Sequence, residues 1–244
     1  MAEDVRAARA AADARDGAGA TPDRRDPASE SLRVPVLTPP VASRRGYLAA
    51  KRALDVIGSL AGILLCLPIW AILVILIKLE SPGPVLFSQT RVGENGRVFR
   101  FLKLRSMYVD ADQRRAAFEE LNEMSGPVFK IRDDPRVTRV GRFLRRYSLD
   151  ETPQLMHVLL GQMTLVGPRP PLLEEVERYE PWQTERLSIR PGLTCIWQVS
   201  GRNEIPFDRW VQMDIYYVRH RTFWMDLWLL VQTVPAVLMA RGAY

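Results

Sequence analysis

The pattern of hydrophobic and polar positions divides the chain into three parts. Residues 1–45 mix Ala, Arg, Asp and Pro without a sustained apolar periodicity, which is typical of a disordered tail. The 22 residues from Val56 to Ile77 carry no charge. As a straight helix this run would be about 33 Å long, enough to cross a hydrocarbon core of roughly 30 Å. We therefore predict a disordered tail over 1–45, a membrane helix over 46–80 and one soluble-facing α/β domain over 81–244.

Pro68 lies near the middle of the apolar run, where a proline removes a backbone hydrogen bond and kinks a helix. Lys and Arg residues lie on both sides of the run, and positive charge favours the cytoplasmic side of a membrane. A re-entrant helix that bends at Pro68 would keep both ends in the cytoplasm. We predict this form and keep a plain single-pass anchor as the alternative, since prolines also occur in spanning helices.

The remaining residues predict short strands and helices. Residues 84–92 and 97–105 are strand-like and are joined by Glu94-Asn95-Gly96, a strong hairpin signal. Further predicted elements are an exposed helix over 109–124, a helix over 153–160 ended by Gly161, a short strand over 194–199 and a helix over 206–219. The predicted fold class is thus α/β, mostly helical, with a re-entrant membrane helix and a small cytoplasmic domain that contains a β-hairpin and interfacial amphipathic helices.

The last apolar segment, residues 223–240, is predicted to lie at the membrane surface. Trp224 and Trp228 with flanking arginines suit a helix at headgroup level, and Asp226 and Gln232 make it a poor spanning helix. A buried core helix fits the segment about as well.

Composition narrows the partners. The net charge is +6, so anionic partners such as phosphates or lipid headgroups are plausible. Two cysteines, Cys66 and Cys195, give neither a disulfide framework nor a zinc site. His157 and His220 are isolated and fit ordinary packing or surface positions. No apolar stretch follows a short basic start, so we expect no signal peptide and a cytoplasmic N-terminus.

Two adjacent carboxylates, Asp150 and Glu151, follow the most basic stretch of the chain in YSLDETPQL. Ser148 and Glu151 have the spacing of a capping box. However, Pro153 would then lie inside the helix, so Thr152 as N-cap with Pro153 at the first helical position is the better start. The acidic pair would lie just ahead of that helix. On local grounds, capping and chemistry remain equally good explanations.

Basic residues near this pair suit phosphate binding, because Arg and Lys neutralise phosphoryl charge. They are Lys103 and Arg105 in FLKLRSM, Arg142, Arg145 and Arg146 ahead of the pair, and Arg169 in GPRP. A carboxylate among them can bind Mg²⁺, which takes oxygen ligands and phosphates. It can instead attack phosphorus and form an acyl phosphate. Each Arg alone is more often a solvated surface charge, so the prediction rests on their joint placement.

From about Lys51 onward the chain resembles the bacterial sugar transferases, which are monotopic polyprenyl-phosphate phosphoglycosyl transferases. The resemblance rests on KRALDVIGSLAGILLCLP, IKLESPGPVLFSQTRVGENGRVFRFLKLRSM, DDPRVTRVGRFLRRYSLDETPQLMHVLLGQMTLVGPRPPL, RPGLTCIWQVSGRN and DIYYVRH, which occur in the family's order. Together these stretches cover about four-fifths of the chain and are far more specific than any single motif.

The resemblance implies transfer of a sugar phosphate from a UDP-sugar to a polyprenyl phosphate such as undecaprenyl phosphate, with release of UMP. It implies a helix broken at Pro68 and an active site on the cytoplasmic face of the bacterial inner membrane. Asp150 corresponds to the nucleophile that carries the phosphosugar, with Mg²⁺ held near it, and Glu151 to its acidic partner. The residues that it assigns to phosphate or substrate binding are Arg145 and Arg169, Lys103 and Arg105 of the basic strand motif, and Gln198 and Arg202 of a later motif.

Two other functions remain open at this level. One is a membrane-anchored basic protein that binds anionic lipid or nucleic acid without catalysis; the other is a metal-dependent phosphohydrolase. We expect membrane lipids as partners and no nucleic acid, because no recognition module accompanies the basic charge. The sugar is not determined, and glucose or galactose is expected by analogy with family members of exopolysaccharide assembly. The oligomeric state stays open, with a homodimer at the membrane a reasonable expectation.

Overall fold

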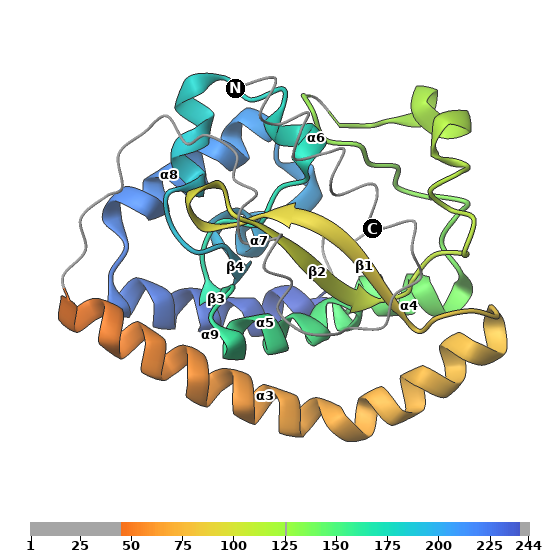
Figure 1. Ribbon diagram of the computed structural model, residues 1–244, viewed down its shortest axis with the longest axis horizontal. Helices are drawn as coiled ribbons and strands as arrows, with labels where there is room; N and C mark the ends of the chain where they lie inside the picture. Colours follow the sequence, from red (N-terminus) through yellow and green to blue (C-terminus); the bar gives the residue numbers. More distant parts are fainter. Residues whose placement is uncertain (1–44, 125, 240–244) are drawn as a thin grey trace.

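The computed structural model describes residues 45–124 and 126–239 (Figure 1). In chain order the elements are α3 (Arg45–Glu80), β1 (Leu86–Val92), η1 (Glu94–Gly96), β2 (Val98–Leu104), η2 (Arg115–Leu121), α4 (Arg139–Arg146), η3 (Leu149–Gln154), α5 (Leu155–Leu160), β3 (Thr164–Val166), α6 (Leu173–Val176), η4 (Pro181–Leu187), β4 (Gly192–Thr194), α7 (Ile196–Ser200), η5 (Arg202–Glu204), α8 (Phe207–His220) and α9 (Phe223–Met239), where η marks a 3₁₀ helix. The tail predicted over residues 1–45 lies outside the described residues, apart from Arg45, at which α3 begins.

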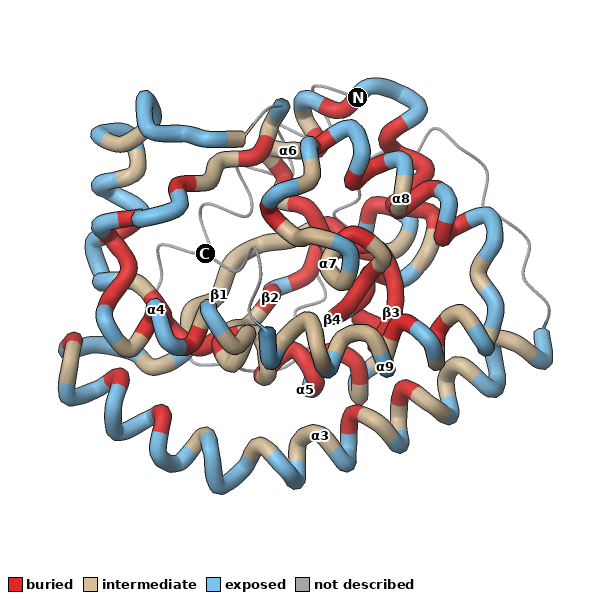
Figure 2. The backbone as a smooth tube through the Cα atoms, turned by 180° about the vertical axis from the view of Figure 1, so that it is seen from behind, coloured by how far each residue is buried: buried red, intermediate tan, exposed pale blue. Residues whose placement is uncertain are grey.

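The apolar run forms one helix, α3, which continues through Pro68. Figure 1 shows α3 bowed beneath the rest of the molecule, with both ends curving towards the body. Its buried residues form two pairs, Asp55 with Ser59 and Leu73 with Ile77. The two members of each pair are about one helical turn apart. The residues between these pairs are exposed or half-buried, as Figure 2 shows. Between these pairs one side of the helix still contacts the body, since Ile63 and Cys66 pack against the core and Trp70 donates a hydrogen bond to Thr152, whereas the other side is exposed. The helix is bent rather than broken.

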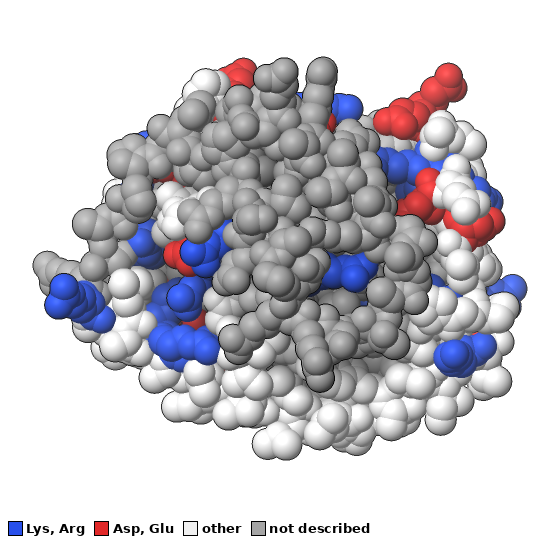
Figure 3. All heavy atoms as spheres, viewed as in Figure 1, with Lys and Arg blue, Asp and Glu red and all other residues white. Residues whose placement is uncertain are grey.

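The middle of α3 presents large apolar side chains to its surroundings. Only 11% of its most apolar 18-residue window is buried inside the structure. The exposed side chains include Leu60, Leu64, Leu65, Leu67 and Ile72. A core helix of a soluble protein would bury such residues, so α3 has the exposure as well as the length and composition of a membrane helix. In Figure 3 the lower edge of the molecule, where Figure 1 places α3, shows almost no charged side chain.

Polar residues attach the first half of α3 to the body. The buried Asp55 carboxylate accepts hydrogen bonds from the Thr164 hydroxyl at 2.9 Å and from the Leu165 N–H at 2.8 Å. One turn earlier, the Lys51 ammonium group forms a 3.0 Å ion pair with Asp226 of α9. Because buried polar groups need partners, these bonds fix where the apolar run starts relative to β3 and α9.

The predicted hairpin is confirmed. Strands β1 and β2 pair antiparallel, from Leu86 opposite Leu104 to Val92 opposite Val98. Their connection contains Asn95 at φ 54° and Gly96 at φ 75°, the left-handed backbone that an Asn-Gly turn supplies.

Other predicted elements are partly wrong in extent. The exposed helix predicted over 109–124 is only the seven-residue η2, which indeed buries no residue. The strand predicted over 194–199 is the end of β4, and α7 replaces its second half. Strand β4 pairs in parallel with β3, which has only three residues, so the ladder ends at Thr194. This parallel pair was not predicted from the sequence. The helix predicted over 206–219 is confirmed as α8.

Helix α9 combines both alternatives considered for the last apolar segment. Asp226 and Leu229 are fully buried against the body, whereas Trp224, Trp228 and Val231 are 77%, 53% and 65% exposed. One face is thus a core face, and the other is an apolar surface rich in Trp, which suits the membrane interface.

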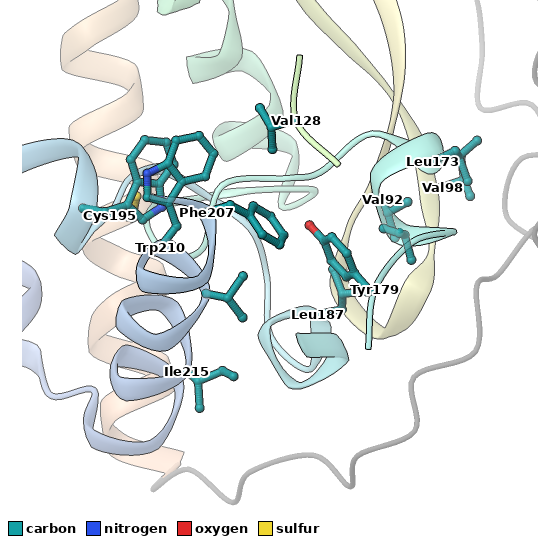
Figure 4. Close-up of a cluster of buried hydrophobic side chains, with 13 residues drawn as sticks. Val92, Val98, Val128, Leu173, Tyr179, Leu187, Cys195, Phe207, Trp210 and Ile215 are labelled. Atoms are coloured by element: carbon teal, nitrogen blue, oxygen red, sulfur yellow. The ribbon is translucent and has the colours of Figure 1, made fainter. Parts of the chain in front are cut away.

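A core of aromatic and aliphatic side chains lies between α8, η4 and the closed end of the hairpin (Figure 4). Trp197 of α7 stacks on Trp210 of α8 with ring centroids 4.2 Å apart and planes 10° apart. Phe207 contacts both Trp210 and Tyr179 in the same cluster. This core is the rigid support for the loops described next.

Candidate active site

The acidic pair lies in the 3₁₀ turn η3, between the basic helix α4 and the short helix α5. The turn begins at Ser148, which has a left-handed backbone with φ 53° and makes no side-chain capping bond. The capping-box alternative is therefore wrong. Asp150 and Glu151 are not needed to cap the helix, which favours a chemical role for the pair.

The prediction that Thr152 caps a helix starting at Pro153 is also wrong. The Thr152 hydroxyl donates to the Leu149 carbonyl at 2.7 Å and accepts a 2.8 Å hydrogen bond from the indole of Trp70. Because the hydroxyl is used in these contacts, the helical turn starts earlier and includes the acidic pair. The bond to Trp70 also joins the turn to the apolar helix α3.

Helix α4 directs one of its arginines into the site. A Cβ atom on Gly141 would lie 1.9 Å from the Ser106 carbonyl oxygen, so only glycine permits this close packing. One turn later, Arg145 donates from Nε to the Ser106 hydroxyl at 3.0 Å. Arg142 and Arg146 of the same helix are exposed. Of the three arginines in this stretch, the fold brings only Arg145 to the acidic pair.

The two basic residues at the end of β2 have different surroundings. The Lys103 ammonium lies 5.3 Å from the centroid of the Phe87 ring. The Arg105 guanidinium instead donates to the backbone carbonyls of Ser81 and Pro82, which follow α3. Arg105 is only 6% exposed. Its contacts hold the chain between α3 and β1, whereas those of Lys103 leave its ammonium available to a ligand.

Arg169 reaches the pair from the loop that follows β3. A Cβ atom on Gly192 would lie 2.0 Å from the Gly167 nitrogen, so these glycines allow the loop to approach β4 closely. The Arg169 guanidinium binds both carboxylate oxygens of Glu151, with one hydrogen bond of 3.0 Å. Such two-pronged, charge-assisted pairs are the strongest ordinary polar contacts in proteins.

A cavity of about 630 Å³ connects these residues. It is lined by all eight residues that the sequence predicts for catalysis or substrate binding: Asp150, Glu151, Lys103, Arg105, Arg145, Arg169, Gln198 and Arg202. Its volume lies in the range of ligand sites. Pro68, by contrast, is exposed on α3 and does not line it.

Gln198 and Arg202 enter from the end of α7. The Gln198 side-chain carbonyl accepts a hydrogen bond from the Cys195 thiol at 3.0 Å. Arg202 has a left-handed backbone with φ 52°, and burial lowers the pKa of its half-buried guanidinium, although the Glu151 charge opposes this. Their roles in binding stay predictions.

The two adjacent carboxylates have opposite electrostatic environments. Asp150 is 5% exposed and makes no hydrogen bond or ion pair with any described residue. Burial, and then the Glu151 charge, raise the pKa of Asp150, while Lys103 and Arg145 oppose the shift. Burial would also raise the pKa of Glu151, but the charge and hydrogen bonds of Arg169 outweigh it and hold this pKa well below its usual range. The charge of Glu151 is therefore compensated by Arg169, whereas the Asp150 carboxylate has no described partner.

Two lysines that line the same cavity are partly buried without a carboxylate partner among the described residues. Burial, followed by the repulsion of Arg145, lowers the pKa of Lys103 to about 8. Burial, followed by the repulsion of Arg169, lowers the pKa of Lys130 to about 7. A nearby anion stabilises the charged form of a buried lysine. Both side chains are therefore suited to binding a phosphate group.

Lys130 was missed by the sequence analysis, where it counted only as part of a basic run. Its neighbours in VFKI offer the missing signal, because Val128 and Ile131 are buried and draw the backbone of Lys130 into the fold. Arg91 of β1 was missed as well. It lines the same cavity and donates to the Pro170 carbonyl at 2.9 Å, which supports the loop of Arg169.

The donor set allows Mg²⁺ only in partnership with substrate. Within residues 45–124 and 126–239, no group of three or more His, Cys, Asp or Glu side chains could hold a metal ion. The uncommitted Asp150 carboxylate is one oxygen ligand, and Mg²⁺ commonly completes its shell with water and substrate phosphates. The residues therefore fit an ion that neutralises the diphosphate of a bound substrate beside Asp150.

Comparison with known proteins decides the family. The family described as "Bacterial sugar transferase" matches residues 46–240. The chain belongs to this family. The resemblance noted from the sequence motifs is thereby confirmed, and the chain is a member of a family of transferase enzymes.

Individual relatives of this bacterial sugar transferase carry related names. The chain is 46% identical over 198 residues to "Galactosyl transferase CpsE" of Streptococcus agalactiae, covering 81% of this chain and 44% of the relative. It is 39% identical over 199 residues to "Exopolysaccharide production protein ExoY" of Rhizobium meliloti, covering 80% and 88%. It is 40% identical over 203 residues to "UDP-glucose:undecaprenyl-phosphate glucose-1-phosphate transferase" of Caulobacter vibrioides, covering 80% and 72%. The chain thus spans less than half of the first relative but most of the other two.

Proposed function

We propose that this protein transfers a sugar 1-phosphate from a UDP-sugar to undecaprenyl phosphate, or a similar polyprenyl phosphate, and releases UMP. The reaction has two half-reactions with a covalent intermediate on Asp150. The observation that carries this proposal is the contrast within the acidic pair: Glu151 is neutralised by Arg169, whereas the buried Asp150 has no partner in the described structure.

In the first half-reaction, an Asp150 carboxylate oxygen attacks the sugar-linked phosphorus of the donor. The bond between this phosphorus and the bridging oxygen breaks, and UMP leaves with that oxygen and its electron pair. In the second, an oxygen of the lipid phosphate attacks the same phosphorus, and the Asp150 carboxylate is regenerated. This division suits the substrates, because one is water-soluble and the other lies in lipid. A carboxylate nucleophile permits such a relay.

The surrounding cations divide the electrostatic work. Lys103 and Arg145 are the positive groups whose charges act most strongly on Asp150, so they stabilise the charge of the transferred phosphoryl group. Arg169 fixes Glu151, whose role is to hold the turn and the guanidinium in place. Mg²⁺ bound at Asp150 and the substrate would supply further neutralisation of the diphosphate.

The membrane arrangement follows from α3 and α9. The bowed α3 exposes its apolar middle, and α9 turns Trp224 and Trp228 outward. We place both helices in one leaflet of the bacterial inner membrane, with α3 re-entrant and the cavity on the cytoplasmic side at the height of the lipid phosphate. This arrangement would let the acceptor keep its polyprenyl chain in the bilayer during the reaction.

The decisive experiment uses purified protein in detergent with Mg²⁺, undecaprenyl phosphate and a panel of UDP-sugars, and it measures UMP. The proposal expects continued release of UMP only when the lipid is present, at most one equivalent of UMP per protein molecule without it, and none from the Asp150→Asn variant. Release of UMP or sugar phosphate at the same rate without lipid would indicate a phosphohydrolase. If no product forms with any donor, the result would favour the alternative of a binding protein without catalysis. UDP-glucose and UDP-galactose are the donors to test first, since relatives are named for both sugars.

A separate experiment tests the re-entrant helix. A cysteine at position 46, in the first turn of α3, and one at position 82, just after its end, should both react with a membrane-impermeant maleimide applied to the exposed cytoplasmic side of inverted vesicles. Labelling of the two positions from opposite sides would establish a single-pass anchor instead. A homodimer stays a prediction that crosslinking in membranes can test.

A further inference from the structure

Lys130 is a charged side chain of the cavity that the proposed mechanism leaves without a task. It lies in the loop before α4, and its ammonium donates to the Asn203 carbonyl oxygen and lies 5.7 Å from the centroid of the Trp210 ring. Trp210 is fixed by its stack with Trp197 inside the core beside Cys195, as Figure 4 shows for Trp210 and Cys195. Lys130 is therefore held in place by neutral groups on a rigid wall, and its charge is directed towards the cavity that it lines.

The positive groups of the cavity form two sets around the acidic pair. The charges that act most strongly on Lys103 are those of Arg145 and Asp150. Those that act most strongly on Lys130 are the charges of Arg169 and Glu151, and Asp150 is not among its leading neighbours. The contacts agree with this division. Lys103 lies on β2, whereas Lys130 lies over Trp210 of α8, and Arg169, which binds Glu151, is joined to α8 by Arg186, which donates to the Arg169 carbonyl at 3.1 Å and to Asp214.

Arg202 belongs to the second set. The leading charges acting on its guanidinium are those of Glu151 and Arg169, as for Lys130. It begins η5, with Gly201 between it and α7, and the next residue, Asn203, is the hydrogen-bond partner of Lys130. Lys130 and Arg202 therefore both line the cavity near Asn203, although they are 72 positions apart in the chain. We call this pair, with Asn203, the distal subsite.

In-line displacement gives such a second subsite a definite task. A carboxylate that attacks phosphorus expels the group on the opposite side, so the phosphate of the departing nucleotide lies away from Asp150. In the second half-reaction, the incoming lipid phosphate must approach opposite the bond that it breaks, which is the bond to Asp150. The leaving nucleotide phosphate and the entering lipid phosphate thus occupy the same position in turn.

We propose that the distal subsite of Lys130, Arg202 and Asn203 is this shared position, binding first the phosphate that leaves in UMP and then the phosphate of the polyprenyl acceptor. The inference rests on the proposed function and deepens it. The subsite stabilises the negative charge of the leaving phosphate, which departs with the electron pair of the broken P–O bond. It later orients the attacking phosphate oxygen, and no proton or further reactant is needed in either step.

The test compares Lys130→Met with Lys130→Arg in two measurements. The first is the exchange of labelled UMP into UDP-sugar without acceptor, which reports the first half-reaction. The second is the dependence of the overall rate on undecaprenyl phosphate at saturating donor. For Lys130→Met, the inference expects kcat/KM to fall about tenfold or more for both UDP-sugar and the lipid, as for the loss of a charge-assisted hydrogen bond. Lys130→Arg should recover most of the loss in both.

A matched control is Arg178→Met, which removes an exposed positive charge that does not line the cavity. It should leave both values of kcat/KM unchanged. A third readout is product inhibition, in which UMP should compete with undecaprenyl phosphate and its inhibition constant should rise in Lys130→Met.

The outcomes separate the two proposals. Absence of UMP exchange in the wild-type protein would overturn the proposed function itself. Normal exchange in the wild type, with Lys130→Met affecting only one substrate or neither, would overturn the shared subsite alone. If Lys130→Met does not fold, as judged by its thermal melting, Arg202→Met tests the same pair of effects.

Discussion

Asp150 and Glu151 are neighbours in sequence, yet the fold gives their carboxylates opposite surroundings. Glu151 is bound through both oxygens by Arg169, whereas Asp150 is more deeply buried and has no described partner. The difference arises from what surrounds one short turn: the β3–β4 region brings an arginine to one carboxylate, while β2 and α4 bring cations towards the other without contact. Two carboxylates thereby differ in their contacts: one is fixed by an arginine, and the other, which we propose as the nucleophile, is buried without a described partner.

The largest loss of activity should follow from removal of the Asp150 carboxylate. We expect Asp150→Asn to lower UMP exchange and overall transfer by at least about 10⁴-fold, because the covalent step loses its nucleophile. The fold should persist, since no hydrogen bond of the described structure depends on this carboxylate. Exchange kinetics together with thermal melting check both statements. Retention of one-tenth of the activity would assign the chemistry to another residue.

Loss of the Glu151–Arg169 ion pair should reduce activity less than loss of the Asp150 carboxylate, but should reduce stability more. Glu151→Gln leaves the Arg169 guanidinium without its partner, so we expect a loss of about 1–3 kcal/mol in unfolding free energy and about 10²-fold in kcat. A double-mutant cycle with Arg169→Gln should show that the two changes are not additive. Additive losses would mean that the two residues act separately on the substrate.

The basic strand motif offers a matched pair for the same distinction. Arg105→Met should lower the melting temperature, because two backbone carbonyls near Ser81 lose their donor, while kcat per folded molecule changes by less than about threefold. Lys103→Met should do the reverse, with a near-normal melting temperature and an activity reduced by about tenfold to a hundredfold. Equal melting temperatures with a larger activity loss in Arg105→Met would show that Arg105 contacts the substrate.

The smallest effect is a change in pH dependence. The pKa of Lys130 is about 7 because of burial and neighbouring charges, so its positive charge is present below this pH and lost above it. We therefore expect kcat/KM for the donor to fall as the pH rises through about 7 in the wild type. In Lys130→Arg this fall should move upward towards the pKa of Lys103, about 8. The groups that face Lys130 and that must stay constant in this comparison are Arg169, Glu151, Arg145 and Glu175. Identical pH profiles of kcat/KM in the wild type and in Lys130→Arg would show that Lys130 is not the group that titrates.

The sequence predicted well what depends on local pattern. The apolar run, the Asn-Gly hairpin and the helix α8 each have a signal within one short stretch, and the structure has them at nearly the predicted bounds. The predicted site residues line one cavity because the family motifs had already grouped them.

What the sequence could not supply depends on contacts between distant segments. The parallel pairing of β3 and β4 joins three-residue strands that have no periodicity to detect. Thr152 looks like a helix cap until Trp70, 82 positions away, takes its hydroxyl. Lys103 and Arg105 look alike in FLKLRSM, and only the carbonyls of the preceding loop separate their surroundings. Lys130 is likewise placed in the cavity by contacts with distant residues, since its ammonium lies over the Trp210 ring.

The most direct test of the account is the intact mass of the protein after incubation with its UDP-sugar and Mg²⁺ in the absence of lipid acceptor. The account predicts an added mass of one sugar phosphate, located on Asp150 by peptide analysis, absent from Asp150→Asn and lost when undecaprenyl phosphate is added. An enzyme that turns over with the lipid but never carries this adduct, or carries it on another residue, would contradict the central claim.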